Sequence, residues 1–530
     1  MDLPYLNKSR LRKLGKCATA AVAFWFGIIG IETAISGTNR EQVAPASNRP
    51  WAPQNLPDYE NALRKGSAEA LEKGKELVEP QKEYTLPDLI DLAEQLNPAT
   101  RVAWQNAKQA LALVGISKSA YYPILSLAAA AGYTRIFAPS PGFKINEGAL
   151  KRDIATGGSA LSAVTLTNGP PFYLDYLYQT ELTMKWLLFD FGQRDATVSA
   201  AREGLMIENM AFNATHQRVV SDVSQSFYAY NLARESIIVA ESASDTSRTV
   251  YSAVRARADN GLATQPELLQ AEQQLAQAQF NLEKARGSEQ DAFADLMNSI
   301  GLPPSVRIRI VESFAGSVKV NLETPLTSLV MRALSQRPDL VVSLAKVKAA
   351  EDKIKAVKAS YFPKLNALAN VGYGEERASL GSHSFQASAP TFGGGLALEF
   401  DVFDGFLKDR SLQAARAELE AASAQLEQNR DEAIRQVWKG YTDLRTAIRS
   451  GDAAAALLKS SQNSYDAVLA SYKLGFSTYT EVVDGETKLT SARNSVFETQ
   501  SAVHQAATRL AYAMGELGNK PTTVHPARKK

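Results

Sequence analysis

The second half of this 530-residue chain repeats its first half, and this repeat constrains the fold more than any single motif does. Residues 89–133 align with residues 329–373 at a constant offset of 240, and thirteen of the 45 positions are identical. A second block aligns at an offset of 214. Its pairs include Phe189-Asp190 with Phe403-Asp404, Ala200-Ala201-Arg202 with Ala414-Ala415-Arg416, Tyr251 with Tyr465, Gly261 with Gly475, Thr264 with Thr478, and Gly301 with Gly515. The sequence therefore predicts two copies of one unit of roughly 200 residues.

The change of offset shows where the copies differ in length. It corresponds to 26 extra residues in the first copy, which must fall between Tyr133 and Leu182. We expect the first copy to span residues 84–313 and the second to span residues 314–518. Each has the same predicted order, namely a helix, a strand, a loop, a strand, a very long helix, a tight turn and a last helix.

The two ends of the chain differ from the repeats. Residues 1–36 resemble an export signal, because several Lys and Arg residues precede an apolar run that ends in Ala34-Ile35-Ser36. A membrane anchor is the alternative, although the apolar run is short for a helix that spans a bilayer. Residues 37–83 are predicted to form an irregular, solvated arm with a short helix near 62–77, and residues 519–530 a basic tail.

Composition excludes several classes of function. A net charge of +2 provides no basic stripe for nucleic acid, and the single cysteine, Cys17, excludes an intrachain disulfide framework. The four histidines are scattered, so no metal or cofactor site is predicted. The sequence shows neither a nucleophile paired with a base nor a phosphate-binding glycine loop, so it does not indicate an enzyme.

Each copy predicts one helix that ends before a proline and then two amphipathic strands. The helices are expected at 86–119 and 325–360, before Pro123 and Pro363. Apolar residues alternate with polar ones in the strands that follow. The apolar series are Leu365, Ala367, Ala369, Val371 and Tyr373; Leu396, Leu398, Phe400 and Val402, which alternate with Glu399 and Asp401; and Leu182, Met184, Trp186 and Leu188.

Helical periodicity then continues far beyond an ordinary helix. Residues 409–472 correspond to some 60 residues, or roughly 90 Å at ~1.5 Å per residue. Such a helix must pack side by side with others in a coiled coil. Gly261 and Gly475 end these helices, and Thr264 and Thr478 can cap the returning ones. Each copy thus contains a long helical hairpin.

Four amphipathic strands per chain cannot close a barrel, and an open sheet edge is not tolerated in lipid. Three identical chains would supply twelve strands. The expected fold is therefore mainly α with membrane β, in which a homotrimeric twelve-stranded barrel continues into a helical coiled-coil barrel. Tyrosines near strand ends could mark the membrane interfaces; they are Tyr133, Tyr173, Tyr176, Tyr178 and Tyr373. A soluble antiparallel sandwich is the alternative.

At this point the chain resembles the TolC-like outer-membrane efflux ducts over residues 84–518. The resemblance rests on Ala-Tyr-Tyr-Pro at 120–123, Ser-Tyr-Phe-Pro at 360–363, Trp-Leu-Leu-Phe-Asp-Phe-Gly at 186–192, and the tips Gly-Leu-Ala-Thr and Gly-Phe-Ser-Thr. It implies a trimer in the outer membrane of a Gram-negative bacterium, with a helical tunnel in the periplasm. It also implies a periplasmic adaptor and an inner-membrane pump or ABC transporter as partners, and an extracellular loop enlarged by the extra residues. The residues implied to contact the adaptor are Gly261, Leu262, Thr264, Gly475, Phe476 and Thr478.

Glu481 and Asp484 are the candidates for a constriction at the channel entrance. They lie three residues apart at the start of one helix, so they share a face, and three chains would place six carboxylates around one axis. Such a ring attracts cations and repels anions, and the family has paired acids here. The alternative is a pair of solvated acids that favour a helix N-terminus.

Tyr472 and Glu267 match family positions that hold the entrance closed through hydrogen bonds between helices. Some members have an arginine two residues after the tip glycine, where this chain has Ser477. We therefore expect a closed state that is held more weakly. An ordinary role of Tyr472 in helix packing is the alternative.

The leading functional hypothesis is a passive exit duct of a tripartite efflux or type I secretion system, which exports small molecules or polypeptides. A structural periplasmic coiled-coil protein without a channel is the alternative. It would need the long helices but not the amphipathic strands.

Overall fold

The computed structural model describes residues 56–76, 78–79, 81–131, 135–138, 141–156, 164–168, 172–311, 325–380 and 383–517. The predicted export signal and the basic tail lie outside these residues. The described residues divide into a sheet unit, Ala120–Phe191 and Phe362–Val402, and a helical unit that holds most of the remainder. Within the described ranges, no helix combines the length and apolarity that a membrane span requires.

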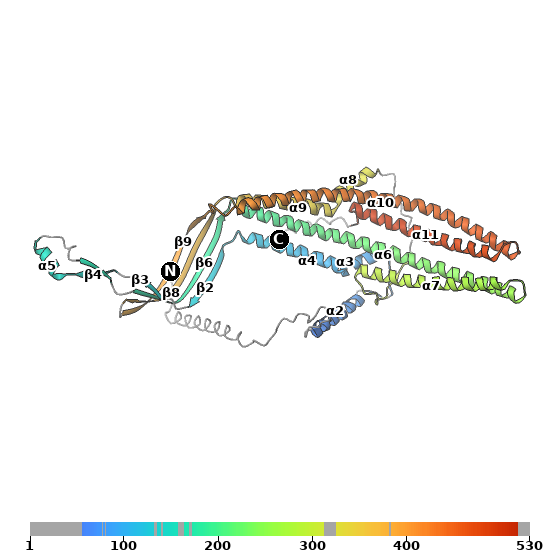
Figure 1. The fold of residues 1–530 in the computed structure, drawn as a ribbon, viewed down its shortest axis with the longest axis horizontal. Coiled ribbons are helices and arrows are strands. Elements are labelled where there is room, and N and C mark those ends of the chain that lie inside the picture. Colours follow the sequence, from blue (N-terminus) through green and yellow to red (C-terminus); the bar gives the residue numbers. More distant parts are fainter. Residues whose placement is uncertain are drawn as a thin grey trace, which may run out of the picture. The chain divides into compact units, whose positions relative to one another are not determined.

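The helical unit is dominated by two long hairpins (Figure 1). The first hairpin consists of α6 (Gln193–Asp259) and α7 (Gln265–Ile300), and the second of α10 (Leu407–Lys473) and α11 (Tyr479–Met514). Equivalent helices of the two hairpins have the same length. Helices α6 and α10 each contain 67 residues, and α7 and α11 each contain 36. The prediction of one very long helix followed by a return helix in each copy is confirmed.

The single helix predicted before each strand is wrong, because each is broken in two. The first copy has α3 (Leu86–Leu96) and α4 (Pro98–Ser119), and the second has α8 (Leu326–Gln336) and α9 (Pro338–Ala359). The break falls in each copy on the residue before a proline, whose ring disfavours helical backbone in its predecessor. Asn97 and Arg337 accordingly have ψ angles of 124°.

These breaks pack against the C-terminal ends of the hairpins. Gly301 and Gly515, which end α7 and α11, have φ angles of 90° and 76°. A Cβ atom on Gly301 would lie 2.9 Å from the Cα atom of Asn97, and one on Gly515 would lie 3.2 Å from that of Arg337. Both the backbone conformation and the close approach therefore require glycine.

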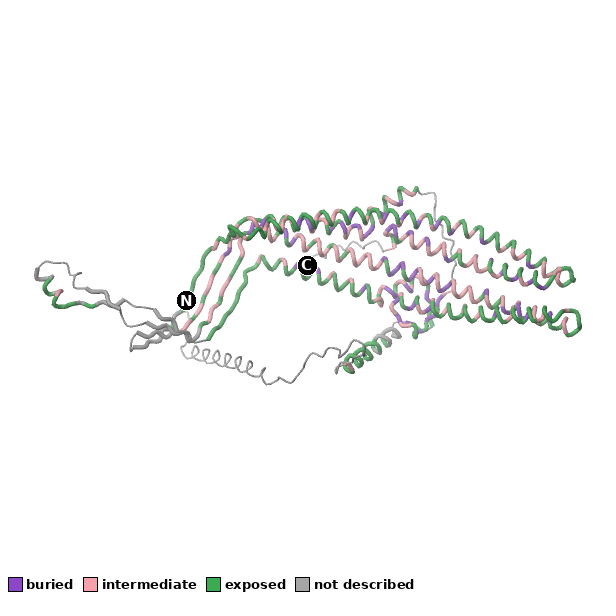
Figure 2. The backbone as a smooth tube through the Cα atoms, in the orientation of Figure 1, coloured by how far each residue is buried: buried purple, intermediate pink, exposed green. Residues whose placement is uncertain are grey.

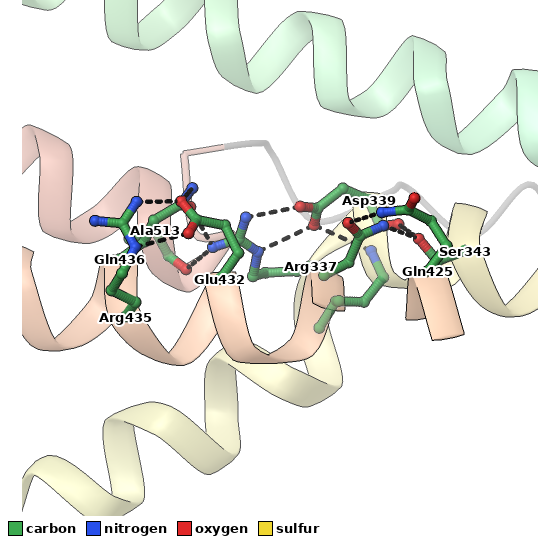
Figure 3. Close-up of polar contacts among 10 residues, drawn as sticks. Arg337, Asp339, Ser343, Gln425, Glu432, Arg435, Gln436 and Ala513 are labelled. Atoms are coloured by element: carbon green, nitrogen blue, oxygen red, sulfur yellow. Dashed lines mark hydrogen bonds and ion pairs between the residues drawn. The ribbon is translucent and has the colours of Figure 1, made fainter. Parts of the chain in front are cut away.

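Arg337 is buried at this contact, with 7% of the residue exposed. Its guanidinium donates to both carboxylate oxygens of Asp339, at 3.0 and 2.7 Å, and to Gln436 Oε1 at 2.9 Å (Figure 3). It also donates to the carbonyl oxygen of Ala513 at 3.1 Å. One side chain thus connects the start of α9 to both helices of the second hairpin.

The main apolar core lies where α3 meets the base of the first hairpin, and buried residues gather there in Figure 2. The end of the predicted N-terminal arm belongs to it, because β1 (Glu83–Tyr84) pairs in parallel with β7 (Arg309–Ile310). The arm is less irregular than predicted. Helix α2 (Leu56–Glu76) begins six residues before the expected start, with Pro57 in its first turn, where proline is favoured.

The sheet unit is antiparallel, in the order β2 (Ile124–Ala131), β6 (Phe172–Phe189), β8 (Lys364–Leu380) and β9 (His383–Glu399). The short strand β3 (Arg135–Ala138) also pairs with β6. The first copy carries extra elements between its two main strands, where the added residues were predicted. They are β4 (Pro141–Ile145), α5 (Glu147–Thr156) and β5 (Val164–Asn168). Strands β2 and β9 form the two edges of this sheet.

The strand register sorts side chains by face. One row across all four strands is Leu127, Leu182, Val371 and Phe392, and Trp186, Ala367 and Leu396 form another row of that face. The opposite face carries the row Ser126, Thr183, Asn370 and Gly393. On it, Asn370 Nδ2 donates to Glu181 Oε1 at 2.9 Å. Leu127 is 78% exposed and Phe392 85%, so the apolar face is open within this chain.

Two details of the strand prediction are wrong or untested. Phe400, Asp401 and Val402 lie beyond β9, because Glu399 pairs with Lys364 and the preceding Pro363 has no N–H to extend the ladder. Tyr133 lies outside the described residues. The other four tyrosines lie in strands, Tyr173, Tyr176 and Tyr178 in β6 and Tyr373 in β8.

Candidate functional site

The two hairpin tips lie at the same end of the helical unit (Figure 1). Gly261 and Gly475 have φ angles of 72° and 84°, so each long helix ends in a left-handed residue. The side chains that follow them are apolar and face solvent, since Leu262 is 69% exposed and Phe476 is 85% exposed. Each tip therefore presents an apolar side chain on a tight turn.

A capping box starts each returning helix. The Thr264 hydroxyl accepts from the backbone N–H of Glu267, whose carboxylate accepts from the Thr264 N–H at 3.2 Å. Thr478 and Glu481 repeat this arrangement in the second hairpin, at 3.4 and 3.1 Å. These reciprocal hydrogen bonds satisfy two donors that a helix N-terminus otherwise leaves free. The predicted caps are confirmed, and both glutamates have a structural role in addition to any role in a channel.

The candidate constriction residues share one solvent-facing stretch of α11. Glu481 and Asp484 are exposed, whereas Val482 between them is buried against the rest of the helical unit. Asp484 does not stand alone, because Lys488 Nζ lies 2.6 Å from its Oδ2 one turn further on. The pair is mostly exposed, so it contributes little to stability, but it places a positive charge beside the acids.

The structure does not join the two candidate latch residues by a hydrogen bond within one chain. The Glu267 carboxylate is engaged in its capping box, and the Tyr472 hydroxyl is buried without a hydrogen-bond partner among the described residues. Burial raises the pKa of Tyr472. Its ring packs on a cluster formed by Val254, Ala271 and Tyr479, which contains residues of both hairpins.

A basic residue that the sequence analysis overlooked lies at this cluster. The guanidinium carbon of Arg257, in the last turn of α6, is 5.0 Å from the centre of the Tyr472 ring. This distance is in the range of a cation–π interaction. The sequence does place Arg257 four residues before the tip glycine, which indicates a position near the tip. It does not show that Arg257 contacts Tyr472 of the other hairpin.

The second overlooked residue is Glu486 on α11, a carboxylate that is only 5% exposed. Its Oε1 accepts a hydrogen bond from the Ser247 hydroxyl of α6 at 3.1 Å. It lines a groove of about 650 Å³ between α6, α7 and α11, whose other walls include Lys284, Asn494 and Glu498 and many alanines and serines. The equivalent residue of the first copy, Glu272, is exposed. The copies therefore use the same carboxylate differently.

Replacing Glu486 with glutamine is expected to stabilise the helical unit near neutral pH by about 1 kcal/mol. Burial raises the pKa of Glu486 in the folded chain. A carboxyl group with a raised folded-state pKa stabilises the fold at low pH, and this stability is lost as the pH rises through that pKa. Denaturant unfolding followed by circular dichroism should show the gain near neutral pH and none at about pH 4. Glu272→Gln is the matched control, and an equal gain there would contradict this explanation.

The chain can now be compared with known proteins. Its sequence matches the outer membrane efflux protein family over residues 89–302 and 329–516. Protein CyaE of Bordetella pertussis is 25% identical over 447 residues, which cover 84% of this chain and 87% of CyaE. Outer membrane protein OprJ of Pseudomonas aeruginosa is 22% identical over 373 residues, which cover 68% of this chain and 74% of OprJ.

A solved structure extends this likeness to the fold. The outer membrane protein VceC of Vibrio cholerae superposes with a TM-score of 0.65 at 19% identity, over 81% of this chain and 96% of VceC. The matched family consists of efflux proteins and is not a class of enzymes. The chain is therefore an outer-membrane protein of a Gram-negative bacterium with a helical part in the periplasm, and it belongs to the outer membrane efflux protein family.

Proposed function

We propose that three copies of this chain form the passive exit duct of a tripartite efflux or type I secretion system. The duct would carry small molecules or polypeptides from a periplasmic adaptor and an inner-membrane pump or ABC transporter to the cell exterior. Three chains would contribute twelve strands to one barrel and six hairpins to one helical tunnel.

The observation that carries this proposal is the sheet unit. It has an apolar face that is exposed across four strands, a polar face behind it, and two edge strands, β2 and β9, each paired on one side only among the described residues. A single sheet of this kind is unstable in lipid, because its edges leave backbone N–H and C=O groups unpaired. Pairing of β2 with β9 of the next copy would remove both edges and turn every apolar face toward lipid.

The tips supply the proposed contact with the adaptor. Leu262 and Phe476 are exposed at the ends of both hairpins, and the groove that contains Glu486 lies along the same helices. The small side chains of its walls would allow a partner helix to approach closely. By family resemblance the adaptor would bind at Gly261, Leu262, Thr264, Gly475, Phe476 and Thr478, and a crosslinker at Phe476 in intact cells should capture it.

The entrance would lie between the tips of the three chains. Glu481 and Asp484 would form its acidic ring, because they occupy an exposed face of α11 near the tip. Tyr472 and Glu267 would belong to the latch that keeps the entrance closed. Within one chain they are not bonded to each other, so a hydrogen bond between them would have to form between neighbouring chains or on a change of state.

We expect the full-length protein to fractionate with the outer membrane and to migrate as a heat-resistant trimer on gels. In planar bilayers the purified trimer should form channels whose opening needs no nucleotide. A soluble, monomeric protein without channel activity would overturn the duct and favour a structural periplasmic role. Phe392→Asp and Leu127→Asp, on the apolar face, should prevent membrane assembly, whereas Ser126→Asp on the polar face should allow it.

A further inference from the structure

We propose that Arg257 is a gate residue of this duct, and that it holds the two hairpin tips together by contacting the ring of Tyr472. The inference rests on the proposed function, because closure of the tips matters only if they surround the entrance of a channel. In this proposal the cation that holds the closed state is Arg257 of the first hairpin. The position beside the second tip, where some family members have an arginine, is the uncharged Ser477.

The guanidinium group of Arg257 lies against the ring of Tyr472. The guanidinium carbon lies 5.0 Å from the ring centre, while the hydroxyl is buried and has no hydrogen-bond partner in the described part of the chain. Arg257 also donates to the carbonyl oxygen of Leu262 at 3.4 Å, so its side chain is held over its own tip. A cation in the last turn of α6 is further favoured by the helix dipole.

The contact occurs once per chain and has no counterpart in the repeat. At the offset of 214, Ser471 takes the place of Arg257 and Ala258 takes the place of Tyr472. The first hairpin thus carries the cation and the second hairpin the aromatic ring. Two copies of one unit that each carry half of a contact form a specific pair, and this asymmetry distinguishes the contact from general helix packing.

Few other polar contacts hold the hairpins together near the tips. Further from the tips, Arg493 donates to Ser242 at 3.2 Å and Ser247 donates to Glu486 at 3.1 Å. Between this last bond and the tips, the approach of Arg257 to Tyr472 is the polar contact that the described residues show from one hairpin to the other. The apolar cluster around Tyr472 lies in the same region, and Arg257 approaches the ring of Tyr472 there.

The test is the resting conductance of the full-length trimer in planar bilayers. Arg257→Gln and Tyr472→Leu should each raise it several-fold, and the double variant should add little to the larger single effect, because both remove one contact. Tyr472→Phe keeps the ring and removes only the hydroxyl, so it should raise the conductance less than Tyr472→Leu does. Arg255→Gln is the matched control, because Arg255 is exposed on the same helix and contacts Tyr251 of its own hairpin.

Two results would overturn the inference while leaving the duct intact. The first is that Arg257→Gln conducts like wild type while Tyr472→Leu opens the channel. The second is that Tyr472→Phe opens the channel as far as Tyr472→Leu, which would identify the hydroxyl as the latch. If the wild-type protein forms no channel at all, the proposed function fails instead. Spin labels at Asn260 and Lys473 of the full chain then still decide the contact. The distances between the tips should broaden in Arg257→Gln, and an unchanged distribution would contradict the proposal.

Discussion

Replacing Arg337 with methionine is expected to lower the free energy of unfolding by about 3 kcal/mol. Methionine keeps an unbranched apolar side chain but has no donors. The substitution would leave Gln436 Oε1 and the Ala513 carbonyl oxygen without the charged donor they have in the fold, and it would separate Asp339 from its bidentate partner. Since these groups belong to three different helices, their docking should weaken together. Denaturant unfolding of the detergent-solubilised protein, followed by circular dichroism, measures this loss.

The same region provides a matched control. Arg435 also pairs with a carboxylate, that of Glu432, but its side chain is 65% exposed. Arg435→Met should therefore change stability much less than Arg337→Met. Arg337→Lys should recover only part of the loss, because an ammonium group cannot bind a carboxylate in the bidentate geometry of a guanidinium. Equal effects of the two methionine variants would show that burial of Arg337 is not the cause.

Neutralising the acids at the proposed entrance is expected to reduce the cation-to-anion permeability ratio several-fold, towards unity. The variant is Glu481→Gln with Asp484→Asn. Glutamine can still accept the Thr478 N–H in the capping box, so the charge is removed while the start of α11 is preserved. In the proposed trimer, this change removes six carboxylates from one ring. The reversal potential across a bilayer with a salt gradient measures the ratio directly.

Removing the charge of Lys488 should change the selectivity in the opposite direction. Its ammonium group lies 2.6 Å from Asp484, so it offsets part of the negative charge at the same place. Lys488→Gln should therefore raise cation selectivity, opposite to the effect of neutralising the acids. Glu241→Gln with Glu283→Gln is the control, because these two exposed carboxylates share Arg286 elsewhere on the first hairpin. A fall in selectivity in the control as large as in the entrance variant would mean that the net charge of the protein, and not a ring, sets the selectivity.

The long elements and their ends were predictable from the sequence because their signals are local. A periodicity near 3.6 sustained over tens of residues indicates a helix, and Gly475 followed by Thr478 marks its end and the start of the next. The helix break at Arg337 also had a local signal, because Pro338 follows it. The apolar pattern continues on both sides of this proline, so a single helix was predicted. The beginning of α2 was placed too late for a similar reason, since Pro57 reads as a loop residue until its position in a first turn is recognised.

The contacts between the hairpins were not predictable, because they depend on which helix faces meet. Arg257 and Tyr472 lie 215 residues apart, and nothing in the spacing of either helix selects the other as its partner. Glu486 shows the same limit. It looks like Glu272, its counterpart in the first copy, until the packing of α11 against α6 buries one of them and leaves the other exposed. Duplication predicts shared architecture but not the point at which two copies diverge.

The equal lengths of the paired helices place the two hairpin turns at the same level. Because α6 and α10 each contain 67 residues, both turns reach the same level and can meet in the cluster around Tyr472. A two-turn insertion of seven residues in each helix of one hairpin alone would displace its turn by ~10 Å. A change in the span of the periplasm could then be followed only by matched insertions in both copies, so length in this fold must evolve in pairs.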